Sequence, residues 1–215
     1  MSAFTIKAAP NTDIWRKPPT TDVFNAPTAI PAGHSPPRTT GPLSSFRSAR
    51  ATFSFSPSQQ YDQAGLLLSL RRRGGGGAST STSAASSGSK PEKWIKTGVE
   101  YYYAKPLVST VACDGWADWS VAPLSGTPGA TTAEGVTIEV VAEGDDKGRS
   151  FWVYQVLLGS GEGDAQKVPL REICWVAAKQ EEWDLSVEAM AARPEAKATT
   201  DELSVEFREF DVQWA

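Results

Sequence analysis

Residues 94–103 read Trp-Ile-Lys-Thr-Gly-Val-Glu-Tyr-Tyr-Tyr, a stretch in which two sets of side chains alternate. Successive side chains of a β-strand point to opposite faces of the sheet. One face therefore carries Ile95, Thr97, Val99, Tyr101 and Tyr103. The other face carries Trp94, Lys96, Gly98, Glu100 and Tyr102. This alternation predicts a strand that packs one face on a core and presents polar and aromatic groups on the other.

Other short segments along the chain have the same β-like character. They are bounded by Gly, Pro or Asp turn signals and comprise residues 50–56, 63–70, 107–113, 136–141, 150–158 and 173–177. In the last stretch the apolar parity switches between Phe207 and Phe210, as a β-bulge would produce. Residues 179–192 fit a helix or a strand equally well. Many short strands with wide loops predict an antiparallel, all-β sandwich or jelly roll.

Two segments interrupt the patterned regions without dividing them into separate domains. Residues 27–42 contain five prolines, which lack the ladder donor, so they are expected to form a Pro-rich connector. Residues 74–89 consist of Gly, Ala, Ser and Thr, which cannot bury apolar area, so a disordered low-complexity loop is predicted. We therefore expect a single β-sandwich domain over residues 1–215 that contains both segments.

Charge and composition exclude several classes of partner. The net charge is −4, with 13 basic and 7 acidic residues in 1–133 and 8 basic and 18 acidic residues in 134–215, so no nucleic-acid partner is expected. Residues 1–7 lack a signal-like apolar run, and no stretch is long and apolar enough for a membrane. Cys113 and Cys174 are too few for a disulfide scaffold, so a cytoplasmic location is predicted. The single histidine, His34, lies in the Pro-rich connector, and neither a metal nor a cofactor is expected.

Three motifs carry a resemblance to a known family. They are Thr-Asp-Ile-Trp-Arg-Lys-Pro-Pro at 12–19, Tyr-Asp-Gln-Ala-Gly-Leu at 61–66, and Trp-Ile-Lys-Thr-Gly-Val-Glu at 94–100 with its continuations at 109–111 and 118–120. Together they resemble the poorly characterised family that includes the fungal regulation-of-enolase protein. This resemblance implies a concanavalin A-like lectin/glucanase jelly-roll β-sandwich. It implies little about chemistry, because one fold hosts many functions.

The polar face of residues 94–102 is the candidate ligand site. Lys96 and Glu100 lie four residues apart on that face, so their side-chain ends are expected to approach each other. Neighbouring polar groups and tryptophans would add hydrogen bonds and stacking surfaces for a sugar. The predicted ligand-binding residues are Trp15, Asp62, Gln63, Trp94, Lys96, Glu100, Asp118 and Trp119. The alternative is a structural Lys96–Glu100 ion pair beneath a loop, with the tryptophans in the core.

These features favour a non-catalytic binding or regulatory protein that recognises a carbohydrate or small polar metabolite on one sheet face. One alternative is a protein–protein interaction module that regulates a metabolic enzyme. Another is a glycoside hydrolase with a carboxylate pair drawn from Glu100, Asp62, Asp118 and Asp114. A neighbouring Lys96 is expected to keep Glu100 ionised, which disfavours the general-acid role. No residue is therefore assigned as catalytic, and enzymatic activity is not expected.

Overall fold

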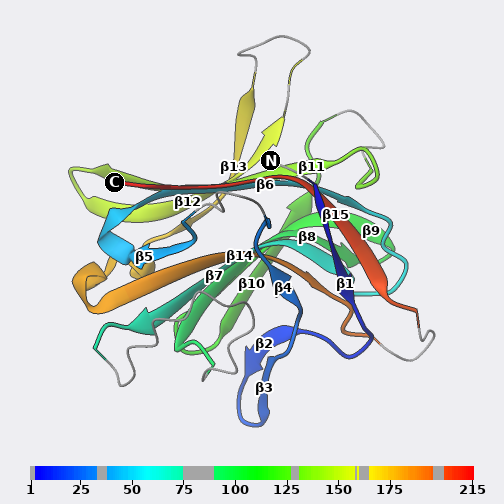
Figure 1. Ribbon diagram of the computed structural model, residues 1–215, viewed down its shortest axis with the longest axis horizontal. Helices are drawn as coiled ribbons and strands as arrows, with labels where there is room; N and C mark the ends of the chain where they lie inside the picture. The colour runs from blue at the N-terminus through cyan, green and yellow to red at the C-terminus, as the bar shows by residue number, and fades with distance from the viewer. Residues whose placement is uncertain are drawn as a thin grey trace.

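Two antiparallel β-sheets pack face to face in the computed structural model, which describes residues 3–32, 38–74, 90–126, 131–157, 159, 165–195 and 201–215 (Figure 1). The six-stranded sheet has the order β1 (Phe4–Ala8), β15 (Leu203–Trp214), β6 (Phe46–Phe55), β11 (Val136–Asp145), β12 (Gly148–Leu157) and β13 (Gln166–Ile173). The other sheet has the order β10 (Ala117–Pro123), β9 (Lys105–Cys113), β8 (Lys93–Tyr102), β7 (Gln63–Arg72), β14 (Trp183–Ala192) and β4 (Thr28–Ala29). Its seventh strand, β5 (Thr40–Pro42), also pairs with β14.

The main core lies between the two sheets and follows the predicted alternation. Ile95 and Val99 of β8 are buried there together with Phe53 and Phe55 of β6. The predicted bulge is confirmed, because the register of β15 against β6 shifts between Phe207 and Glu209. Apolar faces on both sheets exclude water from a shared layer, which is the main stabilising contribution in a sandwich. The prediction of an all-β, antiparallel sandwich is confirmed.

Two of the expected elements differ from the structure. The predicted strand at 173–177 is wrong, because β13 ends at Ile173 and Trp175–Ala177 form the 3-10 helix η2. The ambiguous segment 179–192 begins with the 3-10 helix η3 (Gln180–Glu182) and continues as β14. In β14, Leu185 and Val187 face the core beside β7. The choice between helix and strand is therefore made by pairing with a distant strand, which the local sequence pattern does not reveal.

Part of the Pro-rich connector is ordered as short strands. Thr28–Ala29 (β4) and Thr40–Pro42 (β5) pair with β14, and the 3-10 helix η1 (Leu43–Ser45) follows. His34 lies outside the described residues, as do residues 75–89 of the low-complexity tract. Within the described ranges, no helix is long and apolar enough to cross a membrane.

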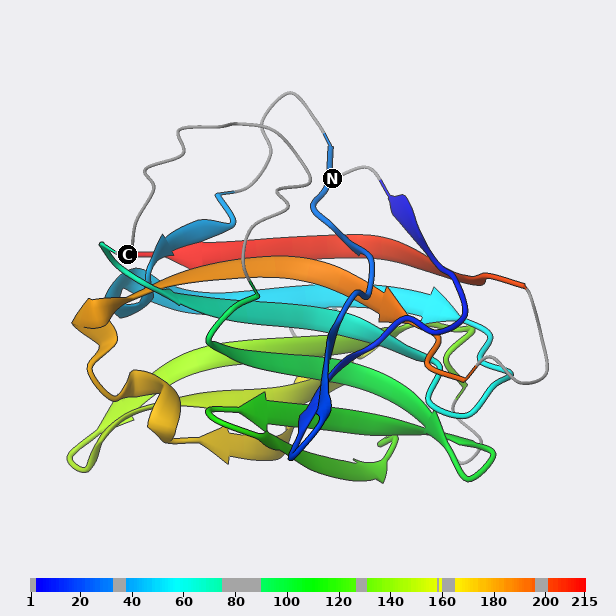
Figure 2. The same ribbon diagram turned by 90° about the horizontal axis from the view of Figure 1, so that it is seen from below.

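A second, smaller core lies on the outer face of the seven-stranded sheet. The hairpin of β2 (Ile14–Lys17) and β3 (Thr21–Phe24) projects beyond this sheet (Figures 1 and 2). Ile14 from this hairpin is buried there with Leu67, Trp94 and Met190. The N-terminal segment therefore covers part of the face on which the polar side chains of β8 stand.

Candidate functional site

The outer face of the seven-stranded sheet contains a small hollow floored by two glycines. Gly65 of β7 lies opposite Gly98 of β8. A Cβ on Gly98 would lie 1.9 Å from the carbonyl oxygen of Ala64 and 2.7 Å from the Cα of Gly65. Neither strand carries a side chain at this pair, so the backbone itself forms the floor. The cavity measures about 10 Å³, which is room for one water-sized group.

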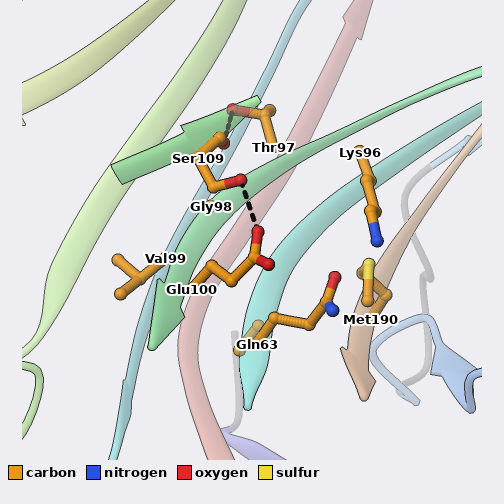
Figure 3. Close-up of a pocket in the computed structure, with 9 residues that line it drawn as sticks. Gln63, Lys96, Thr97, Gly98, Val99, Glu100, Ser109 and Met190 are labelled. Atoms are coloured by element: carbon orange, nitrogen blue, oxygen red, sulfur yellow. Dashed lines mark hydrogen bonds between the residues drawn. The ribbon is translucent and has the colours of Figure 1, made fainter. Parts of the chain in front are cut away.

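Polar side chains from three strands surround this floor. The hollow is lined by Gln63 of β7, Lys96 and Glu100 of β8, Ser109 of β9 and Met190 of β14. Figure 3 shows the amide of Gln63, the ammonium of Lys96 and one carboxylate oxygen of Glu100 pointing into the space between them. All three residues are buried. Burying such groups costs free energy unless they are paired. Their convergence on one hollow therefore marks it as a candidate site for a polar ligand.

Glu100 is held at one end of the hollow by two donors. Ser109 Oγ donates to its Oε2 at 2.8 Å, and Trp119 Nε1 donates to the same oxygen at 3.0 Å. Burial raises the pKa of Glu100 above its ordinary value, although Lys96, Ser109 and Trp119 act in the opposite direction. Lys96 was expected to favour the ionised form of this carboxyl, but its attraction does not lower the pKa on balance, because desolvation outweighs it.

Lys96 is paired at the other end of the hollow with a residue that the sequence did not identify. Its Nζ lies 3.1 Å from Asp13 Oδ1, which also accepts from Gln63 Nε2 at 3.4 Å and from the backbone N–H of Ile14 at 2.7 Å. The same Nζ lies 5.7 Å from the ring centroid of Trp15. The predicted Lys96–Glu100 ion pair is replaced by Lys96–Asp13, because the N-terminal segment folds over this end of β8.

Five of the eight predicted ligand residues gather at the hollow: Trp15, Gln63, Lys96, Glu100 and Trp119. Trp94 is 1% exposed within the second core, so it offers no surface to a ligand. Asp62 is fully buried in an ion pair with Arg193. The side chain of Asp118 is 73% exposed and pairs with Arg171. These three residues are corrected to packing or ion-pair roles apart from the hollow.

The sequence also missed the residues that shape the hollow. Asp13 and Gly65 fall inside the family-like motifs, but neither belongs to the alternating pattern that singled out β8. Ser109 and Met190 reach the site only through strand pairing. Within the described ranges, no group of three or more His, Cys, Asp and Glu side chains is placed to hold a metal ion. Cys113 and Cys174 are free thiols, the first buried and the second exposed.

The contribution of Glu100 to the stability of the protein is expected to fall as the pH rises through its titration. The raised pKa means that the folded state holds this proton more tightly than the unfolded chain. Stability is therefore lost as the pH rises above about 4.3, the ordinary value, until the carboxyl has ionised in the folded state. Glu100→Gln cannot ionise, so its stability relative to the native protein should increase over this range.

Urea unfolding at a series of pH values measures the difference, and Glu206→Gln, at a half-exposed side chain, is the control. Parallel stability curves for Glu100→Gln and the native protein would contradict the assignment.

Comparisons with other proteins find similarity in sequence and in fold. An uncharacterised protein of Emericella nidulans is 41% identical over 191 residues, which span 89% of this chain and 77% of that protein. The crystal structure of a functionally unknown protein from Saccharomyces cerevisiae is similar with a TM-score of 0.61 and 19% sequence identity. The match covers 100% of this chain and 89% of the yeast protein's chain. The alginate lyase from Klebsiella pneumoniae is more distant, with a TM-score of 0.46, 12% identity, and coverage of 79% of this chain and 60% of its own.

The family comparison extends over nearly the whole chain. A model described as "Protein of unknown function (DUF1349)" matches residues 1–214, a range that includes both sheets, the N-terminal segment and every residue of the hollow. The chain therefore belongs to the DUF1349 family.

Proposed function

We propose that this protein is a non-catalytic binding protein that recognises a neutral carbohydrate on the outer face of its seven-stranded sheet. The observation that carries the proposal is the glycine-floored hollow, with the converging polar groups of Gln63, Lys96 and Glu100. Trp15 lies beside Lys96 at one end, and Trp119 lies beside Glu100 at the other. Both indole rings are partly exposed, so they can stack on a sugar that lies across the hollow.

The size and chemistry of the hollow favour a hydroxyl group. A volume of about 10 Å³ admits a group the size of water. A hydroxyl can donate to the carboxylate of Glu100 or the amide oxygen of Gln63 while it accepts from the ammonium of Lys96. A sugar presents such groups on a ring that stacks well against an indole. In this proposal the hollow provides the hydrogen bonds to the sugar, and the tryptophans provide the apolar stacking contacts.

The same geometry disfavours an anionic ligand such as a sugar phosphate. The ammonium of Lys96 is already paired with Asp13, and the carboxyl of Glu100 lies at the opposite end. A phosphate is larger than the hollow and would place negative charge near two carboxyl groups. The ligand class is therefore narrowed to neutral, hydroxyl-rich molecules.

The proposal is tested by titrating the protein with glucose, mannose, galactose and N-acetylglucosamine. At least one of these sugars should change the tryptophan fluorescence, because Trp15 and Trp119 flank the hollow. Glu100→Gln should weaken that binding by about tenfold, since it removes a charged hydrogen-bond acceptor while it keeps the shape of the side chain. Glu206→Gln, on the other sheet, should bind normally. Equal affinity in Glu100→Gln, or no response to any sugar, would overturn the proposal.

The two alternative functions make different predictions in the same experiments. A glycoside hydrolase would release reducing ends from oligosaccharides and would lose that activity in Glu100→Gln. A module that regulates a metabolic enzyme would bind that enzyme without responding to sugars. The binding protein is favoured over the hydrolase because Asp62, Asp114 and Asp118 are each engaged in ion pairs away from the hollow. The second carboxyl at the hollow, Asp13, is paired with Lys96.

A further inference from the structure

An aromatic cluster lies next to the Glu100 end of the hollow. It consists of Tyr61, Tyr102, Tyr103 and Trp119, and is called the aromatic platform below. Tyr61 stacks on Tyr102 with ring centroids 5.6 Å apart, and Tyr102 lies 4.3 Å from Tyr103. Trp119 meets Tyr102 edge-on at 5.0 Å. Tyr103 is 74% exposed, so the cluster is not part of either core.

The aromatic platform is continuous with the hollow. Tyr102 follows Glu100 by two residues on β8, so both side chains stand on the same face of the sheet. Trp119 joins the two directly, because its Nε1 donates to Glu100 while its ring contacts Tyr102. Gln63 adds a second link, since its Nε2 donates to the carbonyl oxygen of Tyr61 at 3.2 Å. One surface therefore runs from the hollow onto the aromatic rings.

The backbone of the platform is held in an unfavourable conformation. Tyr61, Tyr103 and Ala104 have φ values of 68°, 48° and 56°, and they make up three of the five non-glycine residues with positive φ in the described chain. The left-handed region is unfavourable for such residues, because it brings the Cβ atom too close to the following carbonyl oxygen. Tyr103 and Ala104 form the turn between β8 and β9, a position where two-residue hairpins prefer Asn-Gly. An exposed tyrosine therefore occupies a position where the turn itself favours another residue.

We infer that the aromatic platform is a second sugar subsite, so that the ligand of this protein is an oligosaccharide. The inference rests on the proposed function of the hollow. Gly98 and Tyr102 lie about 13 Å apart along β8, a span longer than one pyranose ring. Aromatic faces with tyrosine hydroxyls at their edges suit a neutral sugar, which has apolar C–H faces and a polar rim. Local strain at exposed residues is typical of sites that are maintained for binding.

The test compares each monosaccharide of the panel with its linear tetrasaccharide by calorimetry. For the sugar that binds, the tetrasaccharide should bind about tenfold more tightly than the monosaccharide, which corresponds to about 1.4 kcal/mol. Tyr103→Asn should remove this gain and leave monosaccharide affinity unchanged. Its melting temperature should stay equal or rise, because asparagine tolerates the left-handed region. Loss of a binding gain without loss of stability is a result that a purely structural tyrosine would not produce.

Two variants serve as controls for the aromatic ring and for the turn. Ala104→Gly relaxes the turn while it keeps every ring, so it should be stabilised and should retain the tetrasaccharide gain. Trp116→Ala removes another exposed aromatic side chain, 55% accessible, and should bind as the native protein does. If Tyr103→Asn retains the gain, or if chain length brings none, the second subsite is overturned while the hollow stands. If no sugar binds at all, both proposals fail.

Discussion

Arg193→Met is expected to lower the free energy of unfolding by about 3–5 kcal/mol, because it leaves a buried carboxylate without its counter-ion. Arg193 Nε lies 2.8 Å from Asp62 Oδ1, and Nη2 lies 2.8 Å from Oδ2, so the pair is bidentate. The two side chains are 5% and 0% exposed. Asp62 also accepts from the backbone N–H groups of Ser58 and Gln59, both at 2.9 Å. Removing the guanidinium therefore leaves a buried charge whose remaining contacts in the described part of the chain include these two neutral backbone donors.

Urea unfolding of Arg193→Met beside Arg171→Met measures this effect. Arg171 pairs with Asp118, whose side chain is 73% exposed, so its loss should cost less than about 1 kcal/mol. The double variant Asp62→Asn with Arg193→Met should recover part of the lost stability, since it removes the stranded charge. Equal costs for Arg193→Met and Arg171→Met would contradict the argument. The pair also fixes the loop that precedes Tyr61, so Arg193→Met should disturb the aromatic platform.

Gly98→Ala is expected to destabilise the protein by about 3 kcal/mol or more. The added Cβ would lie 1.9 Å from the carbonyl oxygen of Ala64, a backbone atom that cannot rotate away. Relief requires β7 and β8 to separate at the centre of the seven-stranded sheet, where their pairing is continuous from Gln63 to Leu70. The same movement would reshape the floor of the hollow, so sugar binding should be lost together with stability.

The matched control for this glycine is Gly115→Ala. A Cβ at Gly115 meets nothing within 4 Å, so the change in stability should stay within about 0.5 kcal/mol. Gly65→Ala should behave like Gly98→Ala, because its Cβ would lie 2.1 Å from the carbonyl oxygen of Thr97. Thermal unfolding of the three variants separates the effect of the close strand approach from a general preference for glycine. A fully stable Gly98→Ala protein would show that the floor of the hollow is not fixed by the glycine pair.

The local pattern was sufficient to predict most of the sheet structure. Alternation placed Phe53 and Phe55 on one face of β6, and the parity change after Phe207 predicted the bulge. These features depend on neighbouring residues and on the two-residue period of a strand. The segment at 173–177 was mispredicted because its apolar residues resemble those of a strand, whereas Trp175–Ala177 form a 3-10 helix.

The candidate site was predictable only along β8 itself. Lys96 and Glu100 were found because they share one strand face, and Gln63 because its motif adjoins that face. Asp13 could not be found in this way, since it lies 83 residues before its partner Lys96 and outside a regular strand. The role of Asp62 was also hidden, because Arg193 is 131 residues distant. No local period links such residues. The pairing of β14 with β7 brings Arg193 to Asp62, and the fold of the N-terminal segment over β8 brings Asp13 to Lys96.

The pattern of residues along the chain was enough to predict an antiparallel β-sandwich and the polar face of residues 94–102. It did so because burial of alternate side chains is a local requirement of every strand. Three features depend on contacts between distant segments: Lys96 pairs with Asp13, Trp94 is buried, and Gly65 meets Gly98 to form a floor. The raised pKa of Glu100 also depends on such contacts, because desolvation arises from all the segments that cover a group.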